Sequence, residues 1–483
     1  MGRTSSPPRD APRTSASHTA LTIGVCTLIG YTAWAWSGLG TWIEPLRFGL
    51  GCLLLILTLF SLRNGRLPRL TRDPYTWLGL TFLLLLAVQT WNSGRYLYFN
   101  PVGERWMYTT APIPWLPWSF NRVESMQMIY WFLPAWALGL AIRNAPDARG
   151  LAWRALLFFV VNATALALFG LVQHVTGSDI VYGFSEGGRG HFYASFGYRN
   201  HAVAYLLLVL AIALGYLAYR LRQRWFMADT RVATDGWLAA TAALVVFIAI
   251  HPALGRVAIV LAWILVLLFL AGYFLRHPYS HAPAARLQIA IVLLLGTGIA
   301  LSWIAIIGGD ALFRRMEGSF VDTFWTNIGN RAWMWSAAIR MWEDHMLWGV
   351  GGWGYRYLLP LYAEGAGLLE IHLPGKANAH NDAVQFLAEF GTAGFSLLLA
   401  ATIVLTGRFI LAWRQAWGRP AAALYAMTAG GLFFVGLHSL VDLPLRNAAV
   451  LQAVTLLLTA VPAAWPNAQD ARSTARNRRR TRA

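Results

Sequence analysis

The sequence predicts an all-α polytopic membrane protein: a helical bundle of about twelve transmembrane helices with one large periplasmic loop. The composition is the first reason, because 57% of the 483 residues are hydrophobic and only 12% are charged. A soluble domain carries about 25% charged residues, which it needs to cover its surface. The second reason is that apolar runs of spanning length recur along the chain. The third is the uneven placement of the basic residues.

Twelve apolar runs each approach the ~20 residues that a helix needs to cross a hydrocarbon core of ~30 Å. Only a helix satisfies its backbone hydrogen bonds within one spanning segment, so each run is interpreted as a transmembrane helix. The runs are 19–38, 46–62, 75–91, 126–142, 155–173, 202–219, 237–251, 257–275, 287–309, 390–407, 420–440 and 447–463.

The basic residues predict the orientation of these spans. With both termini cytoplasmic, the inside segments hold 25 of the 39 Lys and Arg residues and only 6 of the 21 acidic residues. Cytoplasmic segments of membrane proteins carry this excess of positive charge. The formal net charge of +18 is therefore a signal of topology, and it does not indicate a nucleic-acid partner. The pattern predicts a bacterial inner-membrane protein.

The chain divides into three predicted parts. Residues 1–18 are rich in Ser, Pro and Arg and are expected to be a disordered cytoplasmic tail. Residues 19–463 form the transmembrane domain, whose periplasmic loop 310–383 lies between the ninth and tenth spans. Residues 464–483 form a basic cytoplasmic tail that is suited to contact anionic membrane lipids.

The long loop itself contains a helical pattern. Trp335, Ile339 and Trp342 recur at helical spacing and share one face. This face suits either a helix that lies along the membrane interface or one that packs on the protein's own outer surface.

Three motifs stand at equivalent places in the topology. Tyr198-Arg199-Asn200-His201, Gly255-Arg256 and Ala379-His380-Asn381-Asp382 each immediately precede a span that begins at the outer face. Helix N-termini attract anions, and guanidinium groups bind phosphate oxygens in a bidentate manner. Arg199 and Arg256 are therefore candidate ligands of a lipid diphosphate, with Asn200 and His201 in support. Alternatively, these arginines only extend towards lipid headgroups.

His380 is the candidate general base, because an imidazole titrates near the pH at which proton transfer is needed. Asn381 follows it, and Asp382, Gln385 and Glu389 then form one polar stripe over two helical turns. An ionisable group such as Glu389 within a span is either functional or paired with an arginine. For His380, the alternative is a histidine that is simply a satisfied polar residue at the interface.

No metal or cofactor is predicted. Asp310, Glu317 and Asp322 lack the spacing of a calcium loop, and no Gly-rich nucleotide-binding loop follows a predicted strand. The absence of a nucleotide motif fits a reaction on the outer face of the membrane.

The stretch AHNDAVQFLAEFGTAG resembles the signature of the O-antigen ligase and polymerase superfamily of bacterial membrane glycosyltransferases. In that signature a His-Asn pair precedes Gly and a second small residue, here Gly391 and Gly394. Three further stretches, NRAWMWSAAIRMWEDHMLWGVGGWGYRYLLPLY, ASFGYRNHAVAYL and HSLVDLPLRN, resemble other segments of this family, so the similarity covers roughly residues 190–450. The stretch LGRVA at 254–258 departs from the expected Ser-Arg-Gly but keeps the arginine, Arg256.

The resemblance implies a metal-independent transfer of a glycan from an undecaprenyl-diphosphate donor to an acceptor hydroxyl. It implies that Arg199 and Arg256 hold the diphosphate and that His380 activates the acceptor. O-antigen ligases, O-antigen or exopolysaccharide polymerases and protein O-oligosaccharyltransferases share the pattern. The acceptor can accordingly be lipid A core, another glycan or a protein hydroxyl.

A transporter or flippase of lipid-linked sugars is the alternative from another class of function. Transporters often show internal repeats and polar sites near the membrane midplane. This sequence shows no convincing repeat, and its polar candidates gather at one face. These features favour the enzyme.

Overall fold

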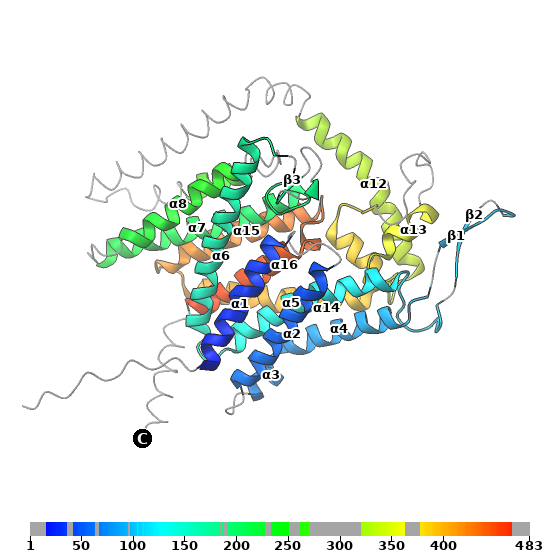
Figure 1. Cartoon of the computed structure of the whole chain (residues 1–483), viewed down its shortest axis with the longest axis horizontal. Helices are drawn as coiled ribbons and strands as arrows, with labels where there is room; N and C mark the ends of the chain where they lie inside the picture. Colours follow the sequence, from blue (N-terminus) through cyan, green and yellow to red (C-terminus); the bar gives the residue numbers. More distant parts are fainter. Residues whose placement is uncertain are drawn as a thin grey trace, which may run out of the picture.

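Long apolar helices make up most of the structure, a computed structural model, and they run side by side as a bundle (Figure 1). The bundle comprises α1 (Ala16–Trp34), α2 (Ile43–Leu62), α3 (Leu67–Arg72), α4 (Pro74–Trp91), α5 (Arg122–Asn144), α6 (Ala148–Val175), α7 (Arg199–Met227), α8 (Ala233–Ile250), α14 (Asp382–Gln415), α15 (Ala421–Ser439), the 3₁₀-helix η3 (Pro444–Arg446) and α16 (Ala448–Ala464). The described residues are 16–35, 42–62, 67–94, 97–103, 105–109, 111–178, 180–182, 185–186, 192–227, 233–250, 261–269, 320–362 and 377–465.

The helices confirm the predicted fold class, an α-helical membrane bundle. Among the described residues, 6 helices are long and apolar enough to cross a membrane, namely α2, α5, α6, α7, α14 and α15. Most of the remaining predicted spans coincide with α1, α4, α8 and α16. The predicted span 257–275 is helical over its described part, 261–269, whereas the predicted span 287–309 lies outside the described residues.

The first helix begins earlier than the sequence predicts. α1 starts at Ala16 and so takes in the last residues of the predicted tail. The reason is a contact of His18, which is buried and whose Nε2 lies 3.6 Å from the Asp147 carboxylate at the start of α6. This contact holds the first turn of α1 against the bundle.

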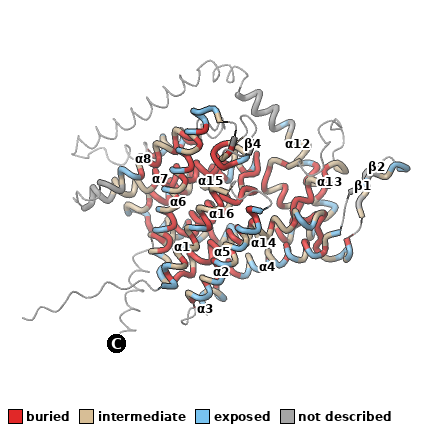
Figure 2. The backbone as a smooth tube through the Cα atoms, viewed as in Figure 1, coloured by how far each residue is buried: buried red, intermediate tan, exposed pale blue. Residues whose placement is uncertain are grey.

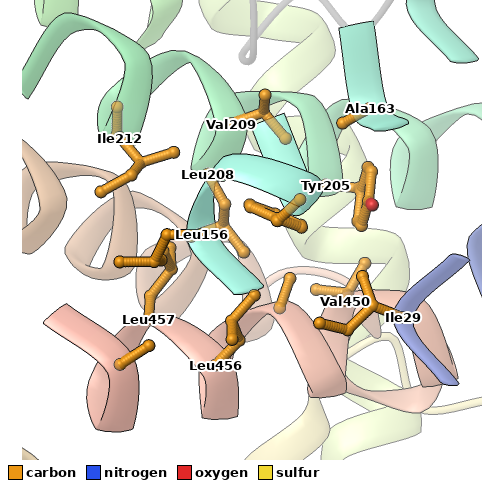
Figure 3. Packing of buried hydrophobic residues seen from close by; sticks show 14 of the residues in the cluster. Ile29, Leu156, Ala163, Tyr205, Leu208, Val209, Ile212, Val450, Leu456 and Leu457 are labelled. Atoms are coloured by element: carbon orange, nitrogen blue, oxygen red, sulfur yellow. The ribbon is translucent and has the colours of Figure 1, made fainter. Parts of the chain in front are cut away.

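α7 lies at the centre of the packing. Its side chains are buried without interruption from Ala202 to Leu214. Figure 3 shows Tyr205, Leu208 and Ile212 of α7 packing with residues of α1, α6 and α16. Buried residues therefore run through the middle of the bundle, whereas α2 and α4 carry exposed residues on their outer sides (Figure 2). Exposed apolar side chains on outer helices are expected where lipid replaces water.

A buried ion pair at the N-terminus of α4 joins three helices. Asp73 caps α4 by accepting from the Tyr75 N–H at 3.2 Å. Its two carboxylate oxygens also accept from Arg143 of α5, at 2.8 and 2.6 Å. Arg408 of α14 approaches the same carboxylate at 3.6 Å. One carboxylate thus fixes the relative positions of α4, α5 and α14.

The segments outside the bundle lie at one end of it. Two short hairpins, β1 (Leu97–Asn100) with β2 (Arg105–Tyr108) and β3 (Ile180–Val181) with β4 (Ser185–Glu186), were not predicted. The predicted loop 310–383 contains α12 (Phe320–Asp344) and α13 (Gly354–Tyr362) (Figure 1).

α12 packs on the protein's own surface. Its Ala337, Ala338 and Met341 are fully buried. The Trp335 indole donates to the Ala379 carbonyl at 2.8 Å, and the Trp342 indole donates to Thr392 Oγ1 at 3.1 Å. These contacts support the second of the two alternatives for this helix.

A single glycine interrupts α14. Gly391 has φ 63° and ψ −175°, a conformation essentially restricted to glycine. The break frees backbone groups for the loop at 346–351: the Thr392 N–H donates to the Met346 carbonyl at 2.7 Å, and the Gly351 N–H donates to the Glu389 carbonyl at 2.8 Å. The close approach at Gly391 is therefore to the loop at 346–351.

Gly391→Ala should lower the thermal stability of the purified protein in detergent. The conformation alone costs about 1–3 kcal/mol for a residue with a Cβ. The added methyl would also stand 2.4 Å from the Leu347 carbonyl oxygen. Gly407→Ala is the matched control, since it lies in the same helix with no atom within 4 Å of the new Cβ. Equal melting temperatures for the two variants would contradict this account of the break.

Candidate functional site

Several helix ends meet at one end of the bundle. α7 begins at Arg199 and α14 at Asp382, while α15 ends at Ser439 and is followed by η3 and then by α16. Asn381 caps α14 by accepting from the Val384 N–H at 3.1 Å. Asn447 caps α16 by accepting from the Ala449 N–H at 3.0 Å. The structure therefore gathers three helix N-termini, of which the sequence predicted those of α7 and α14.

Asp442 is the centre of this cluster. Its carboxylate lies 3.2 Å from His380 Nδ1 and 3.6 Å from His438 Nε2. The Asn200 amide donates to its Oδ2 at 2.6 Å, and the Tyr198 hydroxyl donates to the same oxygen at 3.2 Å. One carboxylate thus connects the starts of α7 and α14 with the end of α15.

The surroundings of Asp442 keep it ionised. Burial acts to raise the pKa of this carboxyl, but hydrogen bonds and charge from His380 and His438 outweigh burial and hold the pKa well below its usual range. Burial and the Asp442 charge raise the pKa of Tyr198, against the charges of Arg331 and Arg199. Asp442 is consequently a carboxylate, and Tyr198 a neutral phenol, at neutral pH.

One ring nitrogen of His380, Nδ1, contacts Asp442, which leaves Nε2 for a substrate. In the neutral form of the imidazole, with Nδ1–H donating to Asp442, Nε2 carries the lone pair. The side chain is 33% exposed, whereas that of Asp442 is 4% exposed. The pair therefore consists of a buried carboxylate and an accessible imidazole that can accept a proton at Nε2.

The backbone before His380 is fixed on several sides. His380 has φ 49°, in the left-handed region that is unfavourable for a residue with a Cβ. The preceding Ala379 donates its N–H to Gln385 Oε1 at 2.9 Å and accepts from the Trp335 indole. Arg356 Nε donates to Asn378 Oδ1 at 3.3 Å. These bonds hold a strained residue in place, as is common at functional sites.

A buried ion pair lies beneath this segment. Arg446 NH1 is 2.8 Å from Glu389 Oε2, and the two side chains are 2% and 0% exposed. The Gln385 amide donates to Glu389 Oε1 at 2.9 Å, which connects the pair to the segment at Ala379. The Arg446 guanidinium also lies 4.6 Å from the ring centroids of Trp353 and Phe386. Glu389 is thus paired with an arginine, one of the two predicted alternatives.

Arg356 also lies over the ring of Trp353. Its guanidinium carbon is 3.4 Å from the ring centroid, closer than that of Arg446. Burial lowers the pKa of Arg356 to about 10, and the charge of Glu124 opposes this shift. Arg356 therefore remains protonated at neutral pH.

The structure places the remaining predicted site residues as follows. Arg199 is half-buried at the first position of α7, beside Tyr198. The His201 ring contacts the edge of Tyr198 with centroids 5.0 Å apart. Asp382 is buried and accepts from the Leu445 N–H at 2.9 Å, so it holds η3 against the start of α14. Arg256 lies outside the described residues.

Several residues of the site were not predicted from the sequence. Asp442 was not among the predicted site residues, and its contact with His380 was not foreseen. Arg331 donates to the Val441 carbonyl beside Asp442, and Arg446 lies beneath the site. The charged residues of HSLVDLPLRN were the available signal, because Asp442 and Arg446 both occur between two apolar runs. Within the described parts of the chain, no group of three His, Cys, Asp or Glu residues is arranged to hold a metal ion.

Comparison of the chain with protein-family models and with curated proteins finds no match in either set. The function is therefore inferred from the residues above and their geometry.

Glu389→Leu should destabilise the protein by about 3–5 kcal/mol, because it leaves the Arg446 charge buried without its partner. The double variant Glu389→Leu/Arg446→Met removes both charges and should recover much of this loss. Thermal unfolding of the purified protein in detergent measures both effects. If the double variant loses as much stability as Glu389→Leu and Arg446→Met added together, the two residues are not coupled.

Proposed function

We propose that this chain is a membrane glycosyltransferase of the O-antigen ligase type. It would move a glycan from an undecaprenyl-diphosphate donor to an acceptor hydroxyl at the periplasmic face of a bacterial inner membrane. The observation that carries the proposal is the His380–Asp442 pair, in which a buried carboxylate orients an accessible imidazole among converging helix ends. The motif around His380 resembles that superfamily, and this resemblance supplies the substrate class.

The chemistry follows from the pair. The acceptor hydroxyl oxygen attacks the anomeric carbon of the donor glycan, and its proton passes to His380 Nε2. The bond between the anomeric carbon and the phosphate oxygen breaks, and undecaprenyl diphosphate leaves with the bonding electrons. Asp442 stabilises the imidazolium that forms, since its carboxylate already contacts Nδ1. The activity is proposed to need no metal ion or cofactor.

Charge near the start of α7 supports the donor assignment. Arg199 occupies the first turn of a long helix, where the helix dipole also favours an anion. A guanidinium there can bind diphosphate oxygens through two hydrogen bonds. Arg256 is proposed as the second such residue on the resemblance alone. The proposed orientation places both termini in the cytoplasm and the site in the periplasm.

The same geometry suits the related enzymes of this superfamily. A polymerase or a protein O-oligosaccharyltransferase would use the same base with another acceptor. Transfer assays with purified protein, an undecaprenyl-diphosphate glycan and lipid A core, glycan or peptide acceptors distinguish these three. Donor binding without turnover on any acceptor would instead favour a transporter of lipid-linked sugars.

His380→Ala should abolish transfer, because the acceptor proton then has no base. Asp442→Asn should also reduce turnover, by no more than the factor of about 10²–10⁴ that a positioned general base contributes, because His380 loses the carboxylate that orients it. In both variants donor affinity should stay near that of the unchanged protein. Turnover in the transfer assay and donor binding by titration are the two measurements. Full turnover in His380→Ala would remove the proposed base.

Arg199→Gln should weaken donor binding by about tenfold or more, as expected for loss of a charge-assisted contact to phosphate. The substitution keeps a polar side chain of similar length, so the start of α7 should be retained. Arg122→Gln is the control, since it removes an arginine from the first turn of another long helix, α5. Titration with the donor and with undecaprenol, which lacks the diphosphate, separates headgroup from chain recognition. The assignment fails if Arg199→Gln and Arg122→Gln bind the donor equally well.

A further inference from the structure

A cavity of about 360 Å³ lies at the opposite end of the bundle from His380. It is bounded by the start of α6 and the ends of α7 and α16, whereas the His380 site lies at the starts of α7 and α16. Arg199 and Arg220 are 21 positions apart on α7, which corresponds to roughly 32 Å of helix. This is close to the thickness of a hydrocarbon core, so the two sites lie at opposite headgroup layers.

Four aromatic rings form the walls of this cavity. Trp153 of α6 packs against Tyr216 of α7 with centroids 5.2 Å apart, and against Trp465 at the end of α16 with centroids 5.3 Å apart. Tyr219 contacts Trp465 with centroids 5.5 Å apart. Amphipathic rings of this kind favour the boundary between lipid and water. The rings brace one another, which makes the cavity a preformed feature.

Basic groups line the same cavity. Arg149 belongs to the first turn of α6, and the Arg220 guanidinium lies 5.9 Å from the Tyr216 ring centroid. Asp147 is the one acidic residue among the described residues of the lining. Its Oδ1 accepts from the Gly150 N–H at 3.0 Å and its Oδ2 lies 3.6 Å from His18 Nε2, so its carboxylate is already engaged. The balance of charge in the cavity therefore favours an anion.

We propose that this cavity binds the phosphate headgroup of an anionic glycerophospholipid. Arg149 and Arg220 would bind the phosphate oxygens, and the aromatic walls would contact the glycerol and the first carbons of the acyl chains. Basic pockets between transmembrane helices at one membrane face bind anionic lipid headgroups in this way. The inference is independent of the proposed transferase activity, because no residue of the His380 site takes part.

Native mass spectrometry of the full chain in detergent tests this site. The probes are phosphatidylglycerol, phosphatidylcholine and inorganic phosphate, each titrated separately. The unchanged protein should bind its first phosphatidylglycerol about tenfold more tightly than its first phosphatidylcholine. In Arg149→Gln/Arg220→Gln the phosphatidylglycerol affinity should fall by about tenfold or more, as expected for loss of charge-assisted contacts.

Arg414→Gln/Arg419→Gln is the matched control. Both arginines are exposed, lie near the turn between α14 and α15 at the same end of the bundle, and do not line the cavity. This variant loses the same charge and should bind phosphatidylglycerol like the unchanged protein. Trp153→Leu should weaken phosphatidylglycerol binding without changing the net charge, because it removes one aromatic wall.

Three results would overturn the proposal. Equal losses in the two double variants would mean that diffuse surface charge attracts the lipid. Equal affinity for phosphatidylglycerol and phosphatidylcholine would mean that the cavity does not select an anionic headgroup. Displacement of phosphatidylglycerol by equimolar inorganic phosphate would mean that the cavity binds free phosphate.

Discussion

The buried pair of Glu389 and Arg446 is the interaction on which the architecture of the site depends. Removing two charges from water costs several kcal/mol per ion, so such a pair persists only with close geometry and further polar contacts. Here the charged groups are 2.8 Å apart, and the Gln385 amide donates to the carboxylate. Trp353 and Phe386 enclose the guanidinium. Separating α14 from η3 would therefore be costly, because it would leave a buried charge without its partner.

This constraint extends to the candidate base. Gln385, held by Glu389, accepts the Ala379 N–H, and His380 follows in its left-handed conformation. Arg446 belongs to the same short segment as Asp442, only four positions along the chain. The candidate base His380, which precedes the N-cap of α14, and Asp442, which follows α15, are thus each close along the chain to one member of the buried pair. The buried Glu389–Arg446 pair therefore helps to hold the segments that carry His380 and Asp442 next to each other.

Much of the bundle could be predicted because the bilayer imposes a simple length and composition on each span. His380, Asn381, Asp382 and Glu389 could also be predicted, since they share one helix start and local spacing determines their relations. The contact of His380 with Asp442 could not, because it joins residues 62 positions apart and depends on how two helix ends pack. The break at Gly391 was equally hidden: the apolar pattern continues through it, and only the loop at 346–351 makes the conformation favourable. Arg446 stands between two predicted spans, but its partner Glu389 could not be predicted, because that contact also depends on how separate helices pack.

α7 connects the two ends of the molecule. Its first turn contributes Asn200 to the Asp442 cluster, its middle is wholly apolar and buried, and its far end carries Tyr216, Tyr219 and Arg220. Polar groups at both ends of a buried helix oppose movement along the membrane normal, since either direction would bring one polar end into hydrocarbon. Alternating access would require the site to open towards both faces. A site fixed at one headgroup layer by such a helix is better suited to chemistry on substrates that approach from that layer, which is where a lipid diphosphate presents its headgroup.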